Sequence, residues 1–117
     1  MPTITELLNL VITDIFNERD TAKRSAAIAE LVTEDIVFVD PDGETRGRAD
    51  FEQKVTALLQ GQPESFRFGD VEAPRAVGDL GVHRWNLGPA GGDVVATGLD
   101  VVLAEGGRIK RLWTLLD

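Results

Sequence analysis

Apolar and polar residues follow one another with helical spacing at the start of the chain. The apolar positions from Ile4 to Ile15 lie three or four residues apart, which predicts an amphipathic helix over residues 4–17. Thr3 and Glu6 have the spacing of a capping box, in which each side chain accepts a hydrogen bond from the backbone N–H of the other residue. The pattern therefore predicts both a helix start and an apolar face to bury.

Two further helices are predicted before residue 64. Asp20 can cap a helix over residues 21–32, which offers several apolar positions for packing. Another apolar stripe covers residues 48–60, and Gly61 followed by Pro63 ends that helix.

The other apolar segments have the pattern of β-strands. A β-branched and aromatic run over residues 36–39 is stopped by Pro41 and the turn pair that follows it. Apolar and polar residues alternate over residues 66–68. Three longer strand candidates, separated by glycine-rich turns, cover residues 76–87, 94–104 and 108–116.

This order of elements predicts one α+β domain over residues 1–117, with no internal repeat or linker. Short turns between the late strands imply an antiparallel meander. We expect three N-terminal helices packed on the concave face of a curved antiparallel sheet. The last strand offers one possible outer contact stripe, formed by Ile109, Arg111, Trp113 and Leu115.

The composition excludes several classes of function. The chain has no cysteine and one histidine, so disulfides, thiolate metal sites and multi-histidine zinc sites are excluded, and we expect no metal and no cofactor. A net charge of −8 repels nucleic acid and anionic lipid. We expect neither nucleic acid nor membrane as a partner and, because no secretory pattern opens the chain, a cytoplasmic location.

Asp100 is the most informative candidate residue because it interrupts an otherwise apolar strand. Burying a carboxylate costs several kcal/mol unless it is protonated or paired. Desolvation would raise its pKa and make it a useful proton donor near neutral pH. The alternative is a structural carboxylate bonded to the backbone or to an arginine, or one on a wet face.

The expected hairpin gives Asp100 its neighbours. A turn centred on residues 90–93 places His83 opposite Asp100 and Trp85 opposite Gly98, all four on one face. Gly98 has no side chain and would leave room for a ligand between Trp85 and Asp100.

Other arrangements of these residues stay open. A one-residue bulge would bring Arg84 and Asn86 to that face instead. His83 could equally be a surface histidine, and Trp85 could be core or dimer packing.

Asp40 is the second candidate acid. It precedes Pro41, which fixes the chain leaving the strand, as a base at a pocket mouth requires. The alternative is a turn aspartate that bonds its own backbone.

Three local patterns, together with the element order, resemble the nuclear transport factor 2 superfamily of cone-shaped α+β barrels. They are residues 38–43 followed by Gly47 and Arg48, residues 97–102, and residues 106–109 leading to Trp113. The resemblance covers nearly the whole chain and implies a homodimer formed through the sheets. Because this superfamily hosts many activities, the fold alone does not determine the function.

Two enzyme groups of this superfamily are most similar. The resemblance to ketosteroid isomerases implies that Asp40 is the base and Asp100 a protonated donor to an oxyanion. Their catalytic tyrosine has no counterpart, since Ile12 stands about there and the chain has no tyrosine. The resemblance to SnoaL-like polyketide cyclases implies an acid/base role for Asp100 beside His83.

Limonene epoxide hydrolase is a third relative, which needs an Asp-Arg-Asp set. Arg84 could match its arginine, but Asn86 and Thr114 stand where the acids should be.

The sequence thus predicts a pocket protein that acts on a small, mostly apolar carbonyl compound by carboxylate acid/base chemistry. A non-catalytic small-molecule binding or dimerisation protein of the same fold is the alternative. The predicted catalytic residues are Asp40, Asp100 and His83. The predicted substrate-binding residues are Trp85, Gly98, Phe38 and Leu112.

Overall fold

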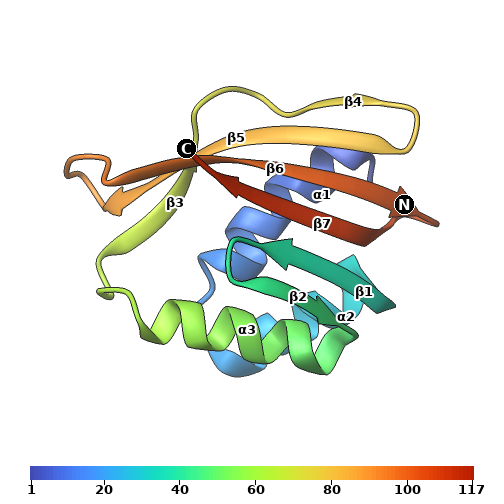
Figure 1. Cartoon of the computed structure of the whole chain (residues 1–117), viewed down its shortest axis with the longest axis horizontal. Coiled ribbons are helices and arrows are strands. Elements are labelled where there is room, and N and C mark those ends of the chain that lie inside the picture. The colour runs from blue at the N-terminus through green and yellow to red at the C-terminus, as the bar shows by residue number, and fades with distance from the viewer.

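The computed structural model describes all 117 residues and contains the three expected helical segments (Figure 1). The first runs as an α-helix, α1 (Ile4–Leu10), and continues without a break as a π-helix, η1 (Val11–Phe16). The other two are α2 (Thr21–Leu31) and α3 (Arg48–Gln60). The predicted capping box is present, since Glu6 N donates to Thr3 Oγ1 at 3.2 Å and Thr3 N donates to Glu6 Oε1 at 3.0 Å.

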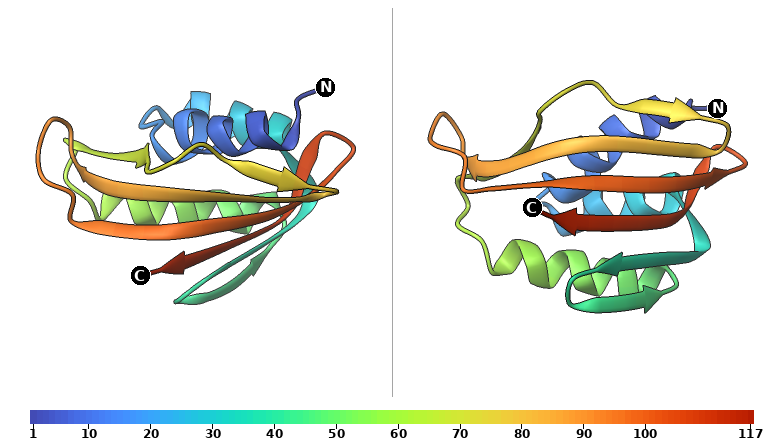
Figure 2. Two further views of the ribbon diagram at one scale, coloured as in Figure 1. Left: turned by 90° about the horizontal axis from the view of Figure 1, so that it is seen from above. Right: turned by 45° about the horizontal axis from the view of Figure 1, so that its top comes forward.

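Seven strands form one curved sheet that keeps all the helices on its inner side (Figure 2). Their order in the sheet is β2-β1-β7-β6-β5-β3, with β4 paired to β5 beside β3. The sheet does not close, because β2 and β3 are edge strands. The strands are β1 (Val32–Asp40), β2 (Gly43–Arg46), β3 (Phe66–Asp70), β4 (Arg75–Val77), β5 (Leu80–Pro89), β6 (Ala96–Glu105) and β7 (Arg108–Leu116).

The expected α+β architecture is confirmed, and the details differ at four places. The turn after Asp40 does not end the local pairing but folds β2 back on β1 as a hairpin. The expected strand over 76–87 is divided at Gly78, whose φ of 58° makes the turn between β4 and β5. β1 and β7 pair in parallel. The sequence did not predict this pairing, because most of the chain separates the two strands and no short turn joins them.

A bulge in β7 also changes the predicted contact stripe. Leu103 pairs with Arg111 but the next residue, Ala104, pairs with Ile109, so Lys110 is an extra residue in β7. Side chains on one side of an extra residue therefore lie on the opposite face from the one that alternation predicts from the other side. Ile109 is therefore fully buried in the core, and its assignment to the outer stripe was wrong.

The core lies between the inner face of the sheet and the helices. Four phenylalanines form its aromatic part, with ring centroids 5.3–6.3 Å apart in tilted or edge-to-face pairs, the arrangement that aromatic quadrupoles favour. They come from η1, β1, α3 and β3, and are Phe16, Phe38, Phe51 and Phe68. No helix of the structure is long and apolar enough to cross a membrane.

Asn17, which follows η1, ties the helical layer to the edge strand β3. Its Nδ2 donates to the Phe68 carbonyl oxygen at 2.8 Å, and its Oδ1 accepts from Phe68 N at 2.7 Å. Both contacts are partly buried, so their loss would leave backbone groups of β3 without partners.

Replacing Asn17 by alanine should therefore lower the free energy of unfolding by about 2 kcal/mol, because two partly buried backbone groups lose their partners. Urea unfolding measures this. Asn9→Ala is the matched control: Asn9 is exposed on α1, and its replacement should change stability by less than about 0.5 kcal/mol. Equal effects of the two substitutions would show that Asn17 does not hold β3.

Candidate functional site

An apolar cavity of about 290 Å³ lies between the inner face of the sheet, η1 and the C-terminal end of α3. Its walls are mainly aromatic and aliphatic, and include Ile12, Phe16, Phe38, Phe68, Trp85 and Leu87. Few polar side chains reach it: Asp100 and Thr114 on the sheet, and Asp40, Asp42 and Gln62 from the turn after β1 and the end of α3. An apolar cavity with a few convergent polar groups is the usual form of a small-molecule site.

Asp100 reaches this cavity from the middle of β6 and is only 5% exposed. Its Oδ1 accepts two hydrogen bonds, from Trp85 Nε1 at 3.1 Å and from Thr114 Oγ1 at 2.8 Å. Trp85 lies on β5 and Thr114 on β7, so the two strands that flank β6 each supply one neutral donor. Oδ2 has no hydrogen-bond partner in the protein, and it is not sealed from solvent.

Burial raises the pKa of Asp100 to about 6, while the hydrogen bonds from Thr114 and Trp85 act in the opposite direction. Near neutral pH the carboxyl group can therefore either give or take a proton. The alternative arrangement, a bond to a backbone amide or an arginine, is absent.

Gly98 makes this arrangement sterically possible. A Cβ atom at this position would lie 2.2 Å from Cζ2 of Trp85 and 2.3 Å from the carbonyl oxygen of Leu115. The indole therefore lies directly over Gly98 on its way to Asp100. The expectation that Gly98 leaves room for a ligand was wrong, because the Trp85 ring fills that room.

The predicted pairing of His83 with Asp100 is confirmed, and no bulge displaces it. Arg84 consequently does not share their face: it is exposed and lies 3.6 Å from an oxygen of Asp117. The imidazole of His83 is fully buried but does not line the cavity. Its Nε2 lies 3.0 Å from Asp70 Oδ1, although the contact lacks the geometry of a hydrogen bond.

His83 therefore makes no hydrogen bond to Asp100, and the expected orienting role is filled by Trp85 and Thr114. Of the two predicted apolar substrate contacts, Phe38 and Leu112, one lines the cavity and the other does not. Phe38 lines the cavity, whereas Leu112 is buried in the core opposite Val102, farther along β7 from the cavity.

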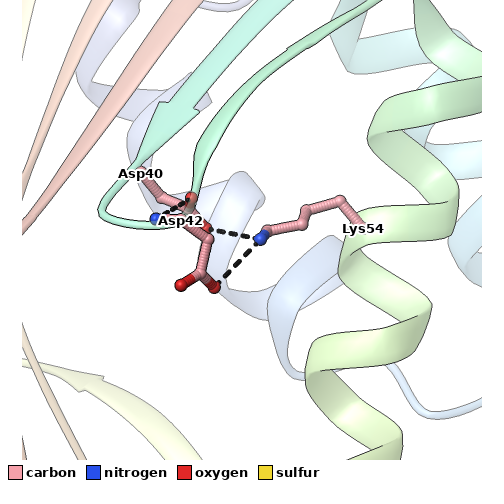
Figure 3. Close-up of polar contacts among 3 residues, drawn as sticks. All are labelled: Asp40, Asp42 and Lys54. Atoms are coloured by element: carbon pink, nitrogen blue, oxygen red, sulfur yellow. Dashed lines mark hydrogen bonds and ion pairs between the residues drawn. The ribbon is translucent and has the colours of Figure 1, made fainter.

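Asp40 lies at the cavity wall and takes part in a small charged cluster (Figure 3). Its Oδ1 accepts from the backbone N–H of Asp42 at 2.9 Å, which is the predicted turn contact. Its Oδ2 lies 3.3 Å from Nζ of Lys54, which reaches across from α3 and also contacts Asp42 Oδ2 at 3.1 Å. Hydrogen bonds to Asp42 and then to Asp40 raise the pKa of Lys54, so the lysine stays protonated.

A family model described as a SnoaL-like domain matches residues 12–112, which is most of the chain. The chain belongs to the SnoaL-like family. The resemblance seen in the sequence is thereby confirmed.

Among solved structures, a candidate isomerase of the SnoaL-like family from Agrobacterium tumefaciens is 28% identical, with a TM-score of 0.87 over 95% of this chain and 94% of that one. A candidate polyketide cyclase from Sinorhizobium meliloti is 21% identical, with a TM-score of 0.74 over 97% and 94% of the two chains. A candidate ketosteroid isomerase from Kribbella flavida is 20% identical, with a TM-score of 0.72 over 95% and 75%. No curated protein matches the chain.

The sequence did not identify three polar groups of this SnoaL-like cavity: Thr114, Gln62 and Asp42, the last of which lies in the turn after β1. Thr114 was noted only because it stands where limonene epoxide hydrolase has an acidic residue, yet its hydroxyl group donates a hydrogen bond to Asp100. Gln62 borders the cavity where α3 has ended, a position no pattern marks. No three acidic or imidazole side chains converge to hold a metal ion.

Asp100 should make the stability of this SnoaL-like protein depend on pH. Its pKa is about 6 in the folded state and about 3.9 in an unfolded chain. The folded state thus binds the proton more tightly, and the resulting stabilisation is complete below about pH 4 and is lost as pH rises through 6. A shift of about two units corresponds to about 3 kcal/mol.

Asp100→Asn keeps the acceptor for Trp85 and Thr114 but cannot titrate. Relative to this variant, the wild type should lose about 2 kcal/mol of stability between pH 4 and pH 7.5, measured by urea unfolding. Asp42→Asn, at a side chain 81% exposed, serves as the control and should leave this Asp100-dependent change in place. A constant difference between wild type and Asp100→Asn across the range would contradict the assignment.

Proposed function

We propose that the cavity binds a small, mostly apolar molecule that carries a carbonyl group, and that Asp100 shares a proton with that group. The observation that carries the proposal is the second oxygen of Asp100, which has no protein partner inside an apolar cavity. A buried carboxyl with one oxygen fixed and the other unpartnered is suited to a ligand's hydrogen bond.

In the proposed reaction, protonated Asp100 donates from Oδ2 to the carbonyl oxygen of the substrate. An apolar substrate expels water from the cavity, and the desolvation favours the neutral acid further. The hydrogen bond strengthens as negative charge develops on the substrate oxygen, which is the condition for lowering a barrier.

Asp40 is the proposed base. One of its carboxylate oxygens takes a proton from the carbon next to the carbonyl. The electron pair of the broken C–H bond forms a C=C bond, and the π pair of the carbonyl moves to the substrate oxygen held by Asp100. Where the enolate is conjugated with a C=C bond, return of the proton from Asp40 to the far carbon gives an isomer. Attack of the enolate carbon on a second carbonyl of the same molecule closes a ring instead, and the new alkoxide takes the proton from Asp40. Neither outcome consumes an oxidant or a reductant.

One comparison supports this class of reaction without naming a substrate. The Agrobacterium protein, which is named a candidate isomerase, shares the fold over nearly its whole length at 28% identity. The apolar wall and the two separated carboxyl groups are the features of the present chain that fit such chemistry.

Non-catalytic binding is the second candidate function, and two observations favour it. Both oxygens of Asp40 are already in contact with protein groups, the Asp42 amide and Lys54. Ile12 lines the cavity about where the isomerases carry a tyrosine, so one donor to the oxyanion is missing.

Deuterium exchange distinguishes the two functions without knowledge of the natural substrate. The wild type is incubated in D₂O with butyrophenone or 1-tetralone, both apolar ketones, and deuterium at the carbon next to the carbonyl is followed by NMR. Catalysis predicts exchange above the protein-free rate, reduced about a hundredfold or more in Asp40→Asn because the base is lost. Asp100→Asn should reduce it less, because an amide N–H replaces the carboxyl O–H.

Asp79→Asn is the control, since Asp79 is exposed between β4 and β5, lies outside the cavity lining and carries no proposed step; its exchange should stay near the wild-type rate. Ketone binding seen as chemical-shift changes, with no exchange above background, would establish the binding function instead. Exchange that is unchanged in both Asp40→Asn and Asp100→Asn would exclude this site.

We also propose that two copies of the chain associate through the outer face of the sheet. That face carries cross-strand apolar pairs, Leu99 with Leu115 and Val101 with Trp113, and Leu115 is 51% exposed. Large apolar side chains left in water on a sheet face are typical of an interaction surface.

Sedimentation equilibrium tests the dimer. The wild type should have twice the 12.7 kDa chain mass, and Leu115→Glu should sediment as a monomer because the charge would be buried at the interface. Val71→Glu is the matched control, at an equally exposed valine just beyond β3. A monomeric wild type would end the proposal.

A further inference from the structure

A second cavity, of about 300 Å³, lies between the start of α2 and the C-terminal half of α3. In contrast to the first cavity it is polar. Its lining includes the side chains of Arg19, Arg24, Thr56, Gln60 and Glu64. Gln62 borders both cavities, so they are neighbours.

Arg24 is only 3% exposed and forms no ion pair with any carboxylate. Its Nη1 donates to the Glu18 carbonyl oxygen at 2.7 Å and its Nη2 to Thr56 Oγ1 at 2.9 Å, and both acceptors are neutral. Its Nε is buried without a partner. A buried guanidinium stays charged, so a counter-charge is missing here.

Arg19 repeats this pattern at the same cavity. Its Nη1 and Nη2 donate to the carbonyl oxygens of Leu59 and Pro63, at 3.0 and 2.9 Å. It too forms no ion pair, although the chain carries 20 acidic residues against 12 basic ones. Two arginines without a carboxylate therefore line one cavity of an acidic protein.

We propose that this second cavity binds a small oxyanion, a phosphate or a carboxylate group, between Arg19 and Arg24. The planar guanidinium group can donate two parallel hydrogen bonds to two oxygens of a carboxylate or a phosphate, and charge-assisted hydrogen bonds are the strong ones. The volume is ample for one phosphate. Glu64 is the one acidic residue in the lining, and since it pairs with neither arginine it opposes the anion by like-charge repulsion.

The anion has two possible sources with the same chemistry. It can be a free oxyanion, or it can be the charged end of a molecule whose apolar part occupies the first cavity, because Gln62 borders both spaces. The site itself does not depend on the proposed acid/base reaction.

Inorganic phosphate is the first probe. It is titrated into the wild type at constant ionic strength, with chloride as the replaced anion, and backbone amide shifts are followed by NMR. Saturable shifts are expected for residues 19–24 and 56–64. Arg24→Lys and Arg19→Gln should each weaken binding about tenfold, since each removes charge-assisted donors, and Glu64→Gln should strengthen it.

Partial unfolding could weaken phosphate binding in both arginine variants, but it could not strengthen binding in Glu64→Gln. Stronger binding by Glu64→Gln therefore distinguishes a specific site from an effect on folding. Arg19→Gln keeps the test decisive if Arg24→Lys does not fold. The proposal is overturned if phosphate shifts these amides no more than chloride does. It is also overturned if the three variants bind phosphate as the wild type does, which would indicate an adventitious ion only.

A matched pair of ketones identifies the source. Butyrophenone and 4-oxo-4-phenylbutanoate differ mainly in the carboxylate at the end of the chain. Tighter binding of the carboxylate by the wild type, lost in Arg19→Gln, would support a charged end that reaches across Gln62. Equal binding of the two ketones, together with saturable phosphate binding, would support a free oxyanion.

Discussion

The buried carboxyl group of Asp100 is the constraint around which the sheet is arranged. An ionisable group on an apolar face needs hydrogen-bond donors, and here they come from the flanking strands, through Trp85 and Thr114. Trp85 can reach Asp100 only because Gly98 has no side chain under the indole. The position of this carboxyl group thus requires particular residue types at three further positions, and it requires the observed register of β5, β6 and β7.

The same arrangement decides what the cavity offers a ligand. Both donors use Oδ1, so Oδ2 is the polar atom of Asp100 left for a bound molecule. Around it the walls are aromatic, and Phe68 is held in place by the two hydrogen bonds between Asn17 and β3. A single unpartnered oxygen among apolar walls is suited to the ligand that we propose, a small apolar molecule with one polar group.

How much the sequence predicts depends on how regular each segment is. The β5–β6 hairpin has no bulge between Leu80 and Leu87, so counting from its turn correctly paired His83 with Asp100. The β6–β7 hairpin has an extra residue at Lys110, and no pattern marks it; strict alternation along the last strand therefore misplaces Ile109, and Thr114 was not recognised as the neighbour of Asp100. Alternation predicts the face of the sheet on which a side chain lies, but not the direction in which it extends over that face. It therefore could not predict that His83 lies beside Asp70, or that the Trp85 ring covers Gly98.

Asp100 and Arg24 present the same physical problem with opposite charge. Each is almost fully buried, each is held by neutral groups, and neither has an ion-pair partner. Replacing such a group with an apolar residue of similar size is often neutral or stabilising, so stability alone does not require either of them. Asp40 differs, because both of its oxygens have partners in the protein: one contacts the Lys54 ammonium group and the other accepts a hydrogen bond from the backbone amide of Asp42. The two buried groups without a counter-charge are therefore the places where the two proposed ligands would supply what the chain lacks: a polar group for Asp100 in the apolar cavity, and a negative charge for Arg24 in the polar one.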